Sequence, residues 1–356
     1  RFDAILSAMF GSHHHRCRTA DPVRLASLLD RPDPQQIQPA RRRPAPCPPV
    51  SDRPQTISAT QMETLMTDPY AFYAQKILRL KPLDPLDQEP DDRLRGILLH
   101  DILQRIIQDD GRTHLDAVID DSFQKFYLDQ AARTLIEPRL RQILLQTLAH
   151  NENWVNENSV RSSAVETTWS MTVPDTTPSI TLTARLDRLD RLDHPDHPDH
   201  LDRLDRLDQQ DDGSFAIIDY KTGANVPSKK AIVSGSACQL VVQTLCVQRG
   251  TDPSGAAGKQ VVLAALWHLK PDEVKETILT NNADDKITLE KICTDGLAGL
   301  ARVLNAFADV RTPYYPVPDP RSAPEHGRYD HLSRRQIWWG LDTDPIPVAA
   351  TRGGES

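Results

Sequence analysis

The sequence lacks any apolar run that approaches the roughly 20 residues needed to cross a membrane, and no secretory signal is visible. We therefore expect no membrane partner. Of the 356 residues, 26% are charged and 38% are hydrophobic, which is typical of a soluble protein with a real core and considerable loop. Because the first residue is Arg1 rather than Met, we expect the chain to be a piece of a longer protein.

Closely spaced cysteine pairs are lacking as well. The five cysteines are odd in number and form no C-x-x-C pair, so neither a disulfide framework nor a zinc site is indicated; they are Cys17, Cys47, Cys238, Cys246 and Cys293. A reducing, cytoplasmic location is the natural expectation. No Walker-type G-x-x-x-x-G-K-[ST] occurs either, so this chain is not expected to hydrolyse ATP itself.

Acidic charge, in contrast, is plentiful. The net charge is -8, which at first argues against a nucleic-acid partner. Between Leu186 and Asp208, however, eight Asp and four Arg supply half of that excess. The remainder is only mildly acidic, and a protein that binds nucleic acid through a cation held by carboxylates need not be basic overall. Charge alone therefore does not decide the partner.

The same acidic stretch is a repeat of three residues, and this period matches neither a strand nor a helix. Prolines at positions 195 and 198 and the simplicity of the repeat predict a mobile hairpin insertion near residues 190–212. His194, His197 and His200 alternate with Asp, so metal binding by the repeat is the alternative interpretation.

Composition divides the chain into three segments. Residues 1–55 hold three consecutive histidines and a run rich in Pro and Arg, and they are predicted to be a largely irregular linker. Residues 56–315 are predicted to form the folded domain. Residues 316–356 are predicted to be a C-terminal tail.

Within the predicted domain, helices come first, and strands and helices then alternate. We expect a capping box at Thr60 and Glu63 to begin the first helix, and Asp68 to cap the next one before Pro69. Further helices are expected near residues 95–108, 115–128, 131–154, 237–249 and 297–310, with strands at 165–173, 179–189, 215–223 and 260–269.

An acid and a lysine lie two residues apart where a short apolar strand ends. Asp219 and Lys221 follow the run Phe215–Ile218, and the turn residues Thr222 and Gly223 come next. Alternate residues of a strand point to the same face, so the two charges should lie side by side. Such a pair can hold a metal ion and a water beside a phosphate. The alternative is an ordinary exposed Asp–Lys pair.

A histidine lies on an otherwise apolar helical face. His100 shares that face with Gly96, Leu103 and Ile107. It should therefore be at least partly buried, either as a core histidine that is satisfied by hydrogen bonds or as a ligand.

The order of these features resembles the PD-(D/E)XK nuclease superfamily, and more narrowly its RecB-type nuclease module. Gly96 and His100 correspond to the G-x-x-x-H helix, Asp187 to the second-strand acid, residues 219–223 to D-Y-K-T-G, and Gln239 to the start of the Q-L helix. The resemblance implies a restriction-endonuclease-like α/β core, in which helices flank a mixed central sheet and extra helices precede it.

The flanking segments are similar to AddB-type subunits of AddAB helicase–nucleases; they are residues 58–60, 68–71, 77–84 and 329–334. This similarity spans roughly residues 50–340. It implies the C-terminal nuclease domain of such a subunit, preceded by a helicase-like region, which acts as a DNA exonuclease in double-strand break repair and recombination. DNA and an AddA-like helicase–nuclease subunit, in a heterodimer, would be the partners.

Three departures from the family pattern stand out. Asp187 and Asp219 lie 32 positions apart, which is far more than the short hairpin of the family. Cys238 stands where a proline or small residue is commoner. The iron–sulfur cysteines of some relatives have no counterpart, so no cluster is expected.

For the chemistry, the resemblance implies a Mg²⁺ ion, with Mn²⁺ as an option because one ligand would be a nitrogen. The implied ligands are His100, Asp187, Asp219 and the backbone carbonyl of Tyr220. Lys221 would orient or deprotonate the attacking water, with its pKa lowered by partial burial and by the metal.

Two further polar residues have parts in this scheme. Gln239 would hold the substrate or Lys221 through a hydrogen bond. Glu166, on the first strand, is either an acid near the metal or an ordinary strand-face residue.

Two other interpretations stay open. A nuclease fold could have lost its activity and serve as a DNA-binding scaffold, although the intact set of His100, Asp187, Asp219 and Lys221 argues against this. A free-standing RecB-family exonuclease is the other, and the fragment-like start of the chain argues against it.

Overall fold

The computed structural model describes residue 8 and residues 42–339, apart from gaps at 82–91, 110–114, 127, 129, 193–212, 224, 257, 282–286 and 320–326. The chain divides into two compact units, Arg1–Arg42 and Arg43–Ser356, and the elements discussed below belong to the second. In the described part of the chain, no helix is both long and apolar enough to span a bilayer. The three consecutive histidines of the predicted linker and the histidines of the triplet repeat lie outside the described residues.

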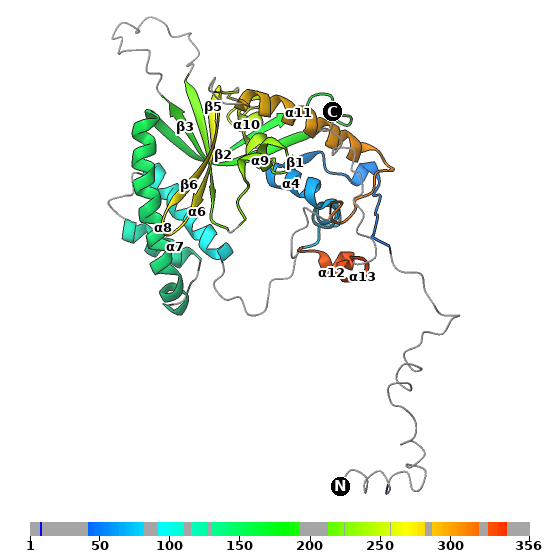
Figure 1. Ribbon diagram of the computed structural model, residues 1–356, viewed down its shortest axis with the longest axis horizontal. Coiled ribbons are helices and arrows are strands. Elements are labelled where there is room, and N and C mark those ends of the chain that lie inside the picture. Colours follow the sequence, from blue (N-terminus) through cyan, green and yellow to red (C-terminus); the bar gives the residue numbers. More distant parts are fainter. Residues whose placement is uncertain are drawn as a thin grey trace, which may run out of the picture. The chain divides into compact units, whose positions relative to one another are not determined.

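The described residues form a mixed six-stranded sheet, as expected (Figure 1). The strands are β1 (Thr56–Ser58), β2 (Val160–Thr172), β3 (Thr181–Leu192), β4 (Ser214–Lys221), β5 (Val261–Leu269) and β6 (Val274–Thr280). β1 is parallel to β3 and β4 is parallel to β5, whereas the pairs β2–β3, β3–β4 and β5–β6 are antiparallel.

The sheet splits along one edge of β3. β2 pairs with β3 over nearly its full length, so β1 and β4 share the opposite edge. β1 pairs with residues 181–183 and β4 with residues 188–192, which leaves residues 184–187 without a strand neighbour on that side. The side chain of Gln243 donates to the carbonyl of Arg185 in this opening, at 3.4 Å. Asp187 therefore lies where β4 separates from β3.

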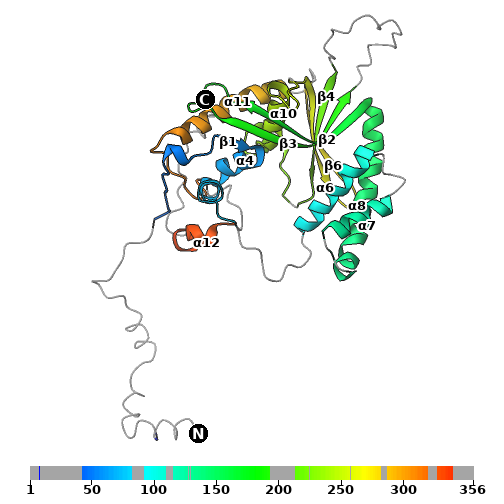
Figure 2. The ribbon, with the colours of Figure 1, turned by 180° about the vertical axis from the view of Figure 1, so that it is seen from behind.

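Helices cover both faces of the sheet (Figures 1 and 2). On one face, α4 (Ala59–Thr67), α10 (Gln239–Arg249) and α11 (Leu289–Ala308) share an apolar core with alternate residues of the strands. On the other face, α6 (Asp92–Asp109), α7 (Leu115–Lys125) and α8 (Gln130–Glu157) pack against residues such as Ile218 and Trp267. The helical periods predicted these elements well; α11 begins earlier than expected, at Leu289.

Strand β3 changes face at Asp187. Leu186 packs in the core on the α10 side, whereas Arg188 lies against Trp267 on the α8 side. Residues two apart in a regular strand point to the same face, so the ladder must be irregular between them. On β2, Glu166 lies opposite this position and has a positive φ of 54°, in the left-handed region that side chains other than glycine seldom adopt. The irregularity turns Asp187 away from both cores.

Of the two predicted helix starts, one is confirmed and the other is wrong. Asp68 accepts a hydrogen bond from the amide of Ala71 and caps α5 (Pro69–Phe72), as predicted. The chain then continues as a π-helical turn, η3 (Tyr73–Ile77). The predicted capping box was wrong by two residues: it is formed by Ser58 and Gln61, each side chain bonding the other's backbone, because the short strand β1 ends at Ser58.

The triplet repeat was also misplaced at its start. The insertion was expected from residue 190, but β3 runs to Leu192. Asp190 is fully buried and accepts hydrogen bonds from Trp154 Nε1 at 3.0 Å and Arg188 Nε at 2.6 Å. The sequence could not show this, because Asp190 is one of several Asp residues at equivalent positions of the triplet repeat. It differs from them only in its structural surroundings. Most of the insertion, residues 193–212, lies outside the described residues.

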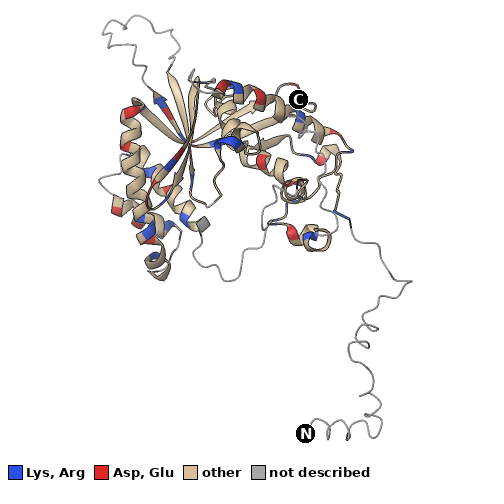
Figure 3. Cartoon of the chain, in the orientation of Figure 1, with Lys and Arg blue, Asp and Glu red and all other residues tan. Residues whose placement is uncertain are grey.

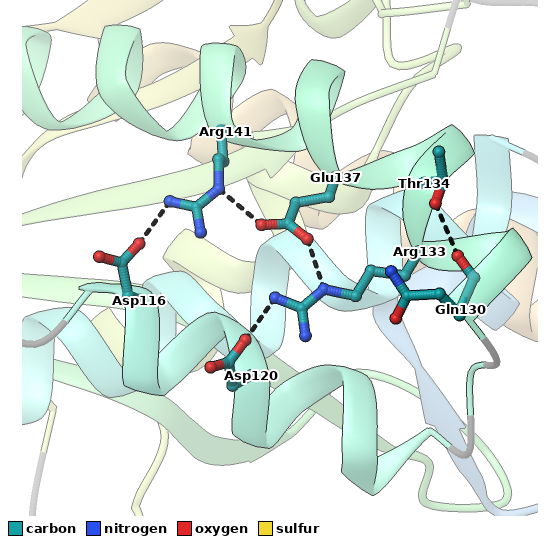
Figure 4. Close-up of polar contacts among 7 residues, drawn as sticks. All are labelled: Asp116, Asp120, Gln130, Arg133, Thr134, Glu137 and Arg141. Atoms are coloured by element: carbon teal, nitrogen blue, oxygen red, sulfur yellow. Dashed lines mark hydrogen bonds and ion pairs between the residues drawn. The ribbon is translucent and has the colours of Figure 1, made fainter.

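Helices α7 and α8 carry both basic and acidic residues (Figure 3), and a ladder of ion pairs joins the two helices (Figure 4). Arg141 contacts Asp116 at 2.6 Å and Glu137 at 2.7 Å, and Arg133 contacts Asp120 and Glu137. Such surface pairs each contribute at most about 1 kcal/mol. They fix the orientation of two helices whose apolar faces already pack together.

Parts of the predicted linker and tail pack into this unit. Arg43 donates to the carbonyl of Val317 and lies over the ring of Trp338. Tyr329 donates to the carbonyl of Leu80 at 2.7 Å. The short elements here are η2 (Val50–Asp52), α12 (Asp330–Ser333) and α13 (Arg335–Trp338); α9 (Lys229–Val233) precedes α10.

Candidate active site

Three acids lie at one level across three adjacent strands. Val165 pairs with Arg188 and Thr167 with Leu186, which places Glu166 opposite Asp187. The pairing of β3 with β4 ends at Arg188 and Ile218, so Asp187 and Asp219 are the next residue of each strand, where the two strands separate. Like charges directly opposite each other destabilise a sheet. Each of the three acids has a basic side chain beside it, which offsets part of this repulsion.

Helix α6 brings a histidine to this row. The Nδ1 atom of His100 lies 3.5 Å from Oδ1 of Asp187. The approach depends on Gly96: a β-carbon there would lie only 2.7 Å from Oγ1 of Thr222, just after β4. Gly96 thus admits the turn that follows Lys221 close to α6.

His100, Glu166 and Asp187 together could hold a metal ion. One ligand atom from each lies within 4.8 Å of the others, and all three side chains are half-buried. Two carboxylates and one imidazole suit a cation that prefers oxygen and tolerates nitrogen. Glu166, which the sequence left between two roles, therefore lies in the group. Asp219 was predicted as a ligand but does not belong to this group within the described residues.

The negative surroundings act on the imidazole. Burial by itself lowers the pKa of His100, but the hydrogen bond and charge of Asp187, and then the charges of Asp219 and Glu166, raise it above its ordinary value. A protonated His100 therefore balances part of the negative charge of the carboxylates around it.

Asp219 lies deeper, within a polar network. Its side chain is 2% exposed, and its Oδ2 atom lies 2.8 Å from Nζ of Lys221, which confirms the predicted pair. Its Oδ1 atom accepts from the amides of Gln239 and Gln243, both at 2.9 Å. Lys221 also donates to Oε1 of Gln239 at 2.8 Å. Of the two predicted roles of Gln239, the structure thus contains the hydrogen bond to Lys221.

The carboxylates around Lys221 oppose the expected lowering of its pKa. Burial does lower it, but the charge and hydrogen bond of Asp219, followed by the charges of Asp187 and Glu63, outweigh burial and raise the pKa. The pKa of Asp219 is also raised, first by burial and then by the charge of Asp187. Lys221 is therefore a firmly held cation here, a state in which it orients groups and stabilises negative charge.

Gln243 is the site residue that sequence reasoning missed. It lies one helical turn after Gln239 on α10, so both amides reach the same carboxylate. Two glutamines spaced by four on an otherwise apolar helix were the signal that could have identified it.

Tyr220 contributes its backbone between the two acids. Its amide donates to Oδ2 of Asp187 at 2.7 Å, while its ring lies against Trp267, where burial raises the pKa of the Tyr220 hydroxyl to about 12. The amide bond orients Asp187 toward the end of β4. A ligand role for the Tyr220 carbonyl stays a prediction.

A buried ion pair lies on β3 directly after Asp187. Arg188 and Asp190 are 1% and 0% exposed, and Trp154, Asn151 and Trp267 surround them. A buried charge without its partner is very costly, so this pair strongly specifies where β3 lies.

Comparison with known proteins agrees with this geometry. The sequence profile of the PD-(D/E)XK nuclease superfamily matches residues 56–202 and 203–314, well over half of the chain. The chain belongs to the PD-(D/E)XK nuclease superfamily. The superfamily match thus begins at β1 and ends beyond α11, and it includes every residue of the site described above.

Three relatives share part of this superfamily domain. An uncharacterised protein of Rickettsia conorii is 24% identical over 206 residues, which is 54% of this chain and 22% of its own length. A subunit of an ATP-dependent helicase/deoxyribonuclease from Streptococcus mutans is 24% identical over 201 residues, 53% of this chain and 16% of its own length. An uncharacterised protein of Rickettsia bellii is 26% identical over 195 residues, with shares of 54% and 22%. The match thus spans less than a quarter of each relative.

Proposed function

We propose that this chain is a Mg²⁺-dependent deoxyribonuclease domain that hydrolyses phosphodiester bonds, with Mn²⁺ as an alternative ion. The observation that carries the proposal is the group of His100, Glu166 and Asp187 beside the Asp219–Lys221 pair. It places a group that could hold a divalent cation beside a lysine whose ammonium group is held in a fixed direction, and a divalent cation can activate water for phosphodiester hydrolysis.

Each residue has a defined part in this proposal. His100, Glu166 and Asp187 would hold the metal, with Asp219 and the Tyr220 carbonyl as the further ligands that the family resemblance implies. When bound, the metal would supply an activated water and neutralise charge on the phosphoryl oxygens. Lys221 holds the water or a phosphoryl oxygen in place by donating hydrogen bonds, and Gln239 fixes the direction of its ammonium group.

We further propose that the domain acts as an exonuclease in an AddB-type subunit, with an AddA-like helicase–nuclease partner, in double-strand break repair and recombination. Two observations support this: the AddB-like segments that flank the domain, and the similarity to the helicase/deoxyribonuclease subunit of Streptococcus mutans.

The second candidate function is an inactive DNA-binding scaffold. It is favoured by the Lys221–Asp219 pair being closed in this structure, with no positive charge left over from that pair. A scaffold, however, has no need for an imidazole and two carboxylates arranged within reach of a single cation.

The test is cleavage of labelled single- and double-stranded DNA by this chain, with Mg²⁺, Mn²⁺ or chelator, alone and with an AddA-like subunit. We expect cation-dependent cleavage. Lys221→Ala should lower the rate by at least about 100-fold, the scale of losing one fixed charge-stabilising donor. Because Gln239 and Gln243 still donate to Asp219, the variant should remain folded by circular dichroism.

Lys275→Ala is the matched control, since Lys275 is an exposed lysine on β6 that pairs with Glu273. It should cleave like the wild type. Near wild-type cleavage by Lys221→Ala would show that the site is assigned wrongly, and DNA binding without cleavage under all conditions would favour the scaffold.

A further inference from the structure

Arg185 is a solvent-exposed residue that contacts Glu166, a member of the metal-capable group of His100, Glu166 and Asp187. It lies two residues before Asp187 on β3, and its side chain is 70% exposed. Its Nε atom forms an ion pair with Oε2 of Glu166 on β2, and Glu166 is only 16% exposed. One of the two carboxylates that could bind a cation is thus occupied by a guanidinium of the same chain.

This ion pair is well suited to be exchanged. An exposed pair gains little, because water solvates the guanidinium and its long side chain loses freedom when held. A divalent cation shared by His100, Glu166 and Asp187 would bring twice the charge to a more enclosed position and relieve the repulsion between the two acids. Lys221 differs from Arg185 in this respect, since its partner Asp219 is buried and fixed by two amides.

The released guanidinium would stand beside the reacting phosphate. Residues two apart on a strand are about 6–7 Å apart. The planar fork of an arginine donates two parallel hydrogen bonds to phosphate oxygens and keeps its charge at every pH of interest. A phosphate next to the one at Asp187 would therefore lie within its reach.

We propose that Arg185 is a metal-responsive phosphate-binding residue. It pairs with Glu166 in the cation-free protein, is released when a divalent cation takes Glu166, and then contacts a DNA phosphate adjacent to the scissile one. The inference rests on the proposed function, because it takes the metal site and the DNA substrate from it. It adds a coupling between two ligands: binding of the cation releases Arg185, and the released Arg185 strengthens the binding of DNA.

The coupling predicts that one substitution of Arg185 strengthens cation binding and weakens DNA binding. Arg185→Gln removes the competitor for Glu166, so the cation should bind more tightly. It also removes a phosphate contact, but only in the cation-bound protein. Arg311→Gln is the matched control, because Arg311 is 87% exposed and pairs with Asp309 beyond the end of α11.

The first experiment is a calorimetric titration of the DNA-free chain with Mn²⁺. Arg185→Gln should bind Mn²⁺ about two- to fivefold more tightly than wild type, the equilibrium equivalent of one exposed ion pair. Arg311→Gln should match the wild type. Unchanged or weaker Mn²⁺ binding by Arg185→Gln overturns the inference, and so does a wild-type chain that binds no Mn²⁺.

The second experiment measures binding of a short DNA duplex at several salt concentrations, in Ca²⁺ and in chelator. In Ca²⁺, the slope of log affinity against log salt should be shallower for Arg185→Gln by about 0.9, the value for one lost phosphate contact. In chelator, the two slopes should agree. An equal difference in both conditions, or none in either, overturns the inference.

The two experiments separate this inference from the proposed function, because neither requires cleavage. If the wild type binds Mn²⁺ and shows the coupling but never cleaves DNA, the nuclease proposal fails and the role of Arg185 stands. If the wild type cleaves and Arg185→Gln behaves like Arg311→Gln, only the role of Arg185 fails.

Discussion

At the scale of single residues, His100 gives the cation-free site a measurable pH dependence. Asp187, Asp219 and Glu166 outweigh burial and raise the folded-state pKa of His100 above its unfolded value of about 6.5. Its stabilising contribution is therefore fully present below about pH 6.5 and is lost as the pH rises through the raised value. In chelator, we expect the free energy of unfolding, measured by urea titration, to fall over this range.

His100→Gln should make that decline shallower. His268 provides the control, because burial, and then the charge of Lys270, lower its pKa, so its titration affects stability only below about pH 6.5. His268→Gln should leave the decline above that pH unchanged. A wild-type stability that rises across the range would contradict the assigned environment of His100.

The single residues of the site were predictable to different degrees. The motif spacing predicted that Asp219 and Lys221 form a pair, because alternation along a strand is a local property. The direction of the Lys221 pKa shift was not predictable, since it depends on how burial balances against Asp187 and Glu63, which come from distant parts of the chain. The position of Glu166 in the metal-capable group depends on a backbone angle that no local rule assigns to glutamate.

At the scale of elements, the distance between α6 and β4 depends on Gly96. A β-carbon there would meet Oγ1 of Thr222 at 2.7 Å, so Gly96→Ala should displace His100 from Asp187. We expect weaker Mn²⁺ binding and a lower melting temperature, although alanine is intrinsically better in a helix by about 1 kcal/mol.

The double variant Gly96→Ala with Thr222→Ala removes the clashing atom and should recover both properties. Gly299→Ala, in α11, is the control: its β-carbon would meet only a flexible arginine end at 3.9 Å, so stability should rise. If the double variant behaved like Gly96→Ala alone, close packing against Thr222 would not be the reason for the glycine.

The end of β3 determines how much of the triplet repeat can be removed without loss of stability. Leu192 pairs with Ser214, so residues 193–212 can be replaced by a short turn without disturbing a described strand pair. We expect this variant to keep its melting temperature within a few degrees, because loop length costs only about 0.6 kcal/mol per doubling. Asp190→Ala should instead cost about 3–5 kcal/mol, since it leaves Arg188 buried without its carboxylate.

Chemical denaturation of the two variants decides this point. A large loss on replacing residues 193–212, or a negligible one for Asp190→Ala, would mean that the buried pair does not hold the strand in place.

Elements with a strong period were predictable, and short or irregular ones were not. The apolar period gave α6, α8 and α10 and the buried strands β4 and β5. β1 has only three residues, and β6 alternates with charged residues at the edge of the sheet, so neither gives a clear signal. The change of face at Asp187 follows from packing on both sides of the sheet, which a period cannot encode.

At the scale of the whole molecule, the predicted tail contributes to the folded unit. Trp338 is 1% exposed, donates to the carbonyl of Ser333 at 2.8 Å and lies against Arg43. Trp338→Ala should therefore cost about 3–5 kcal/mol of unfolding free energy. Its neighbour Ile337 is 49% exposed, and Ile337→Ala should cost far less. Equal effects of the two changes would mean that residues 327–339 do not belong to the core, and the boundary predicted at residue 315 would then hold.

The anchoring of β3 at Asp190 also bears on how the gene can change. The insertion is built from tandem units of three residues such as Asp–Arg–Leu and Asp–His–Pro, and gain or loss of a whole unit changes the chain by three residues without shifting the reading frame. Since the strand register is held by Arg188, Asp190 and Trp154 on one side and by Ser214 on the other, such events change only the length between them. Chains with more or fewer units should therefore melt alike, and repeat number is free to drift while Asp187 and Asp219 stay in place.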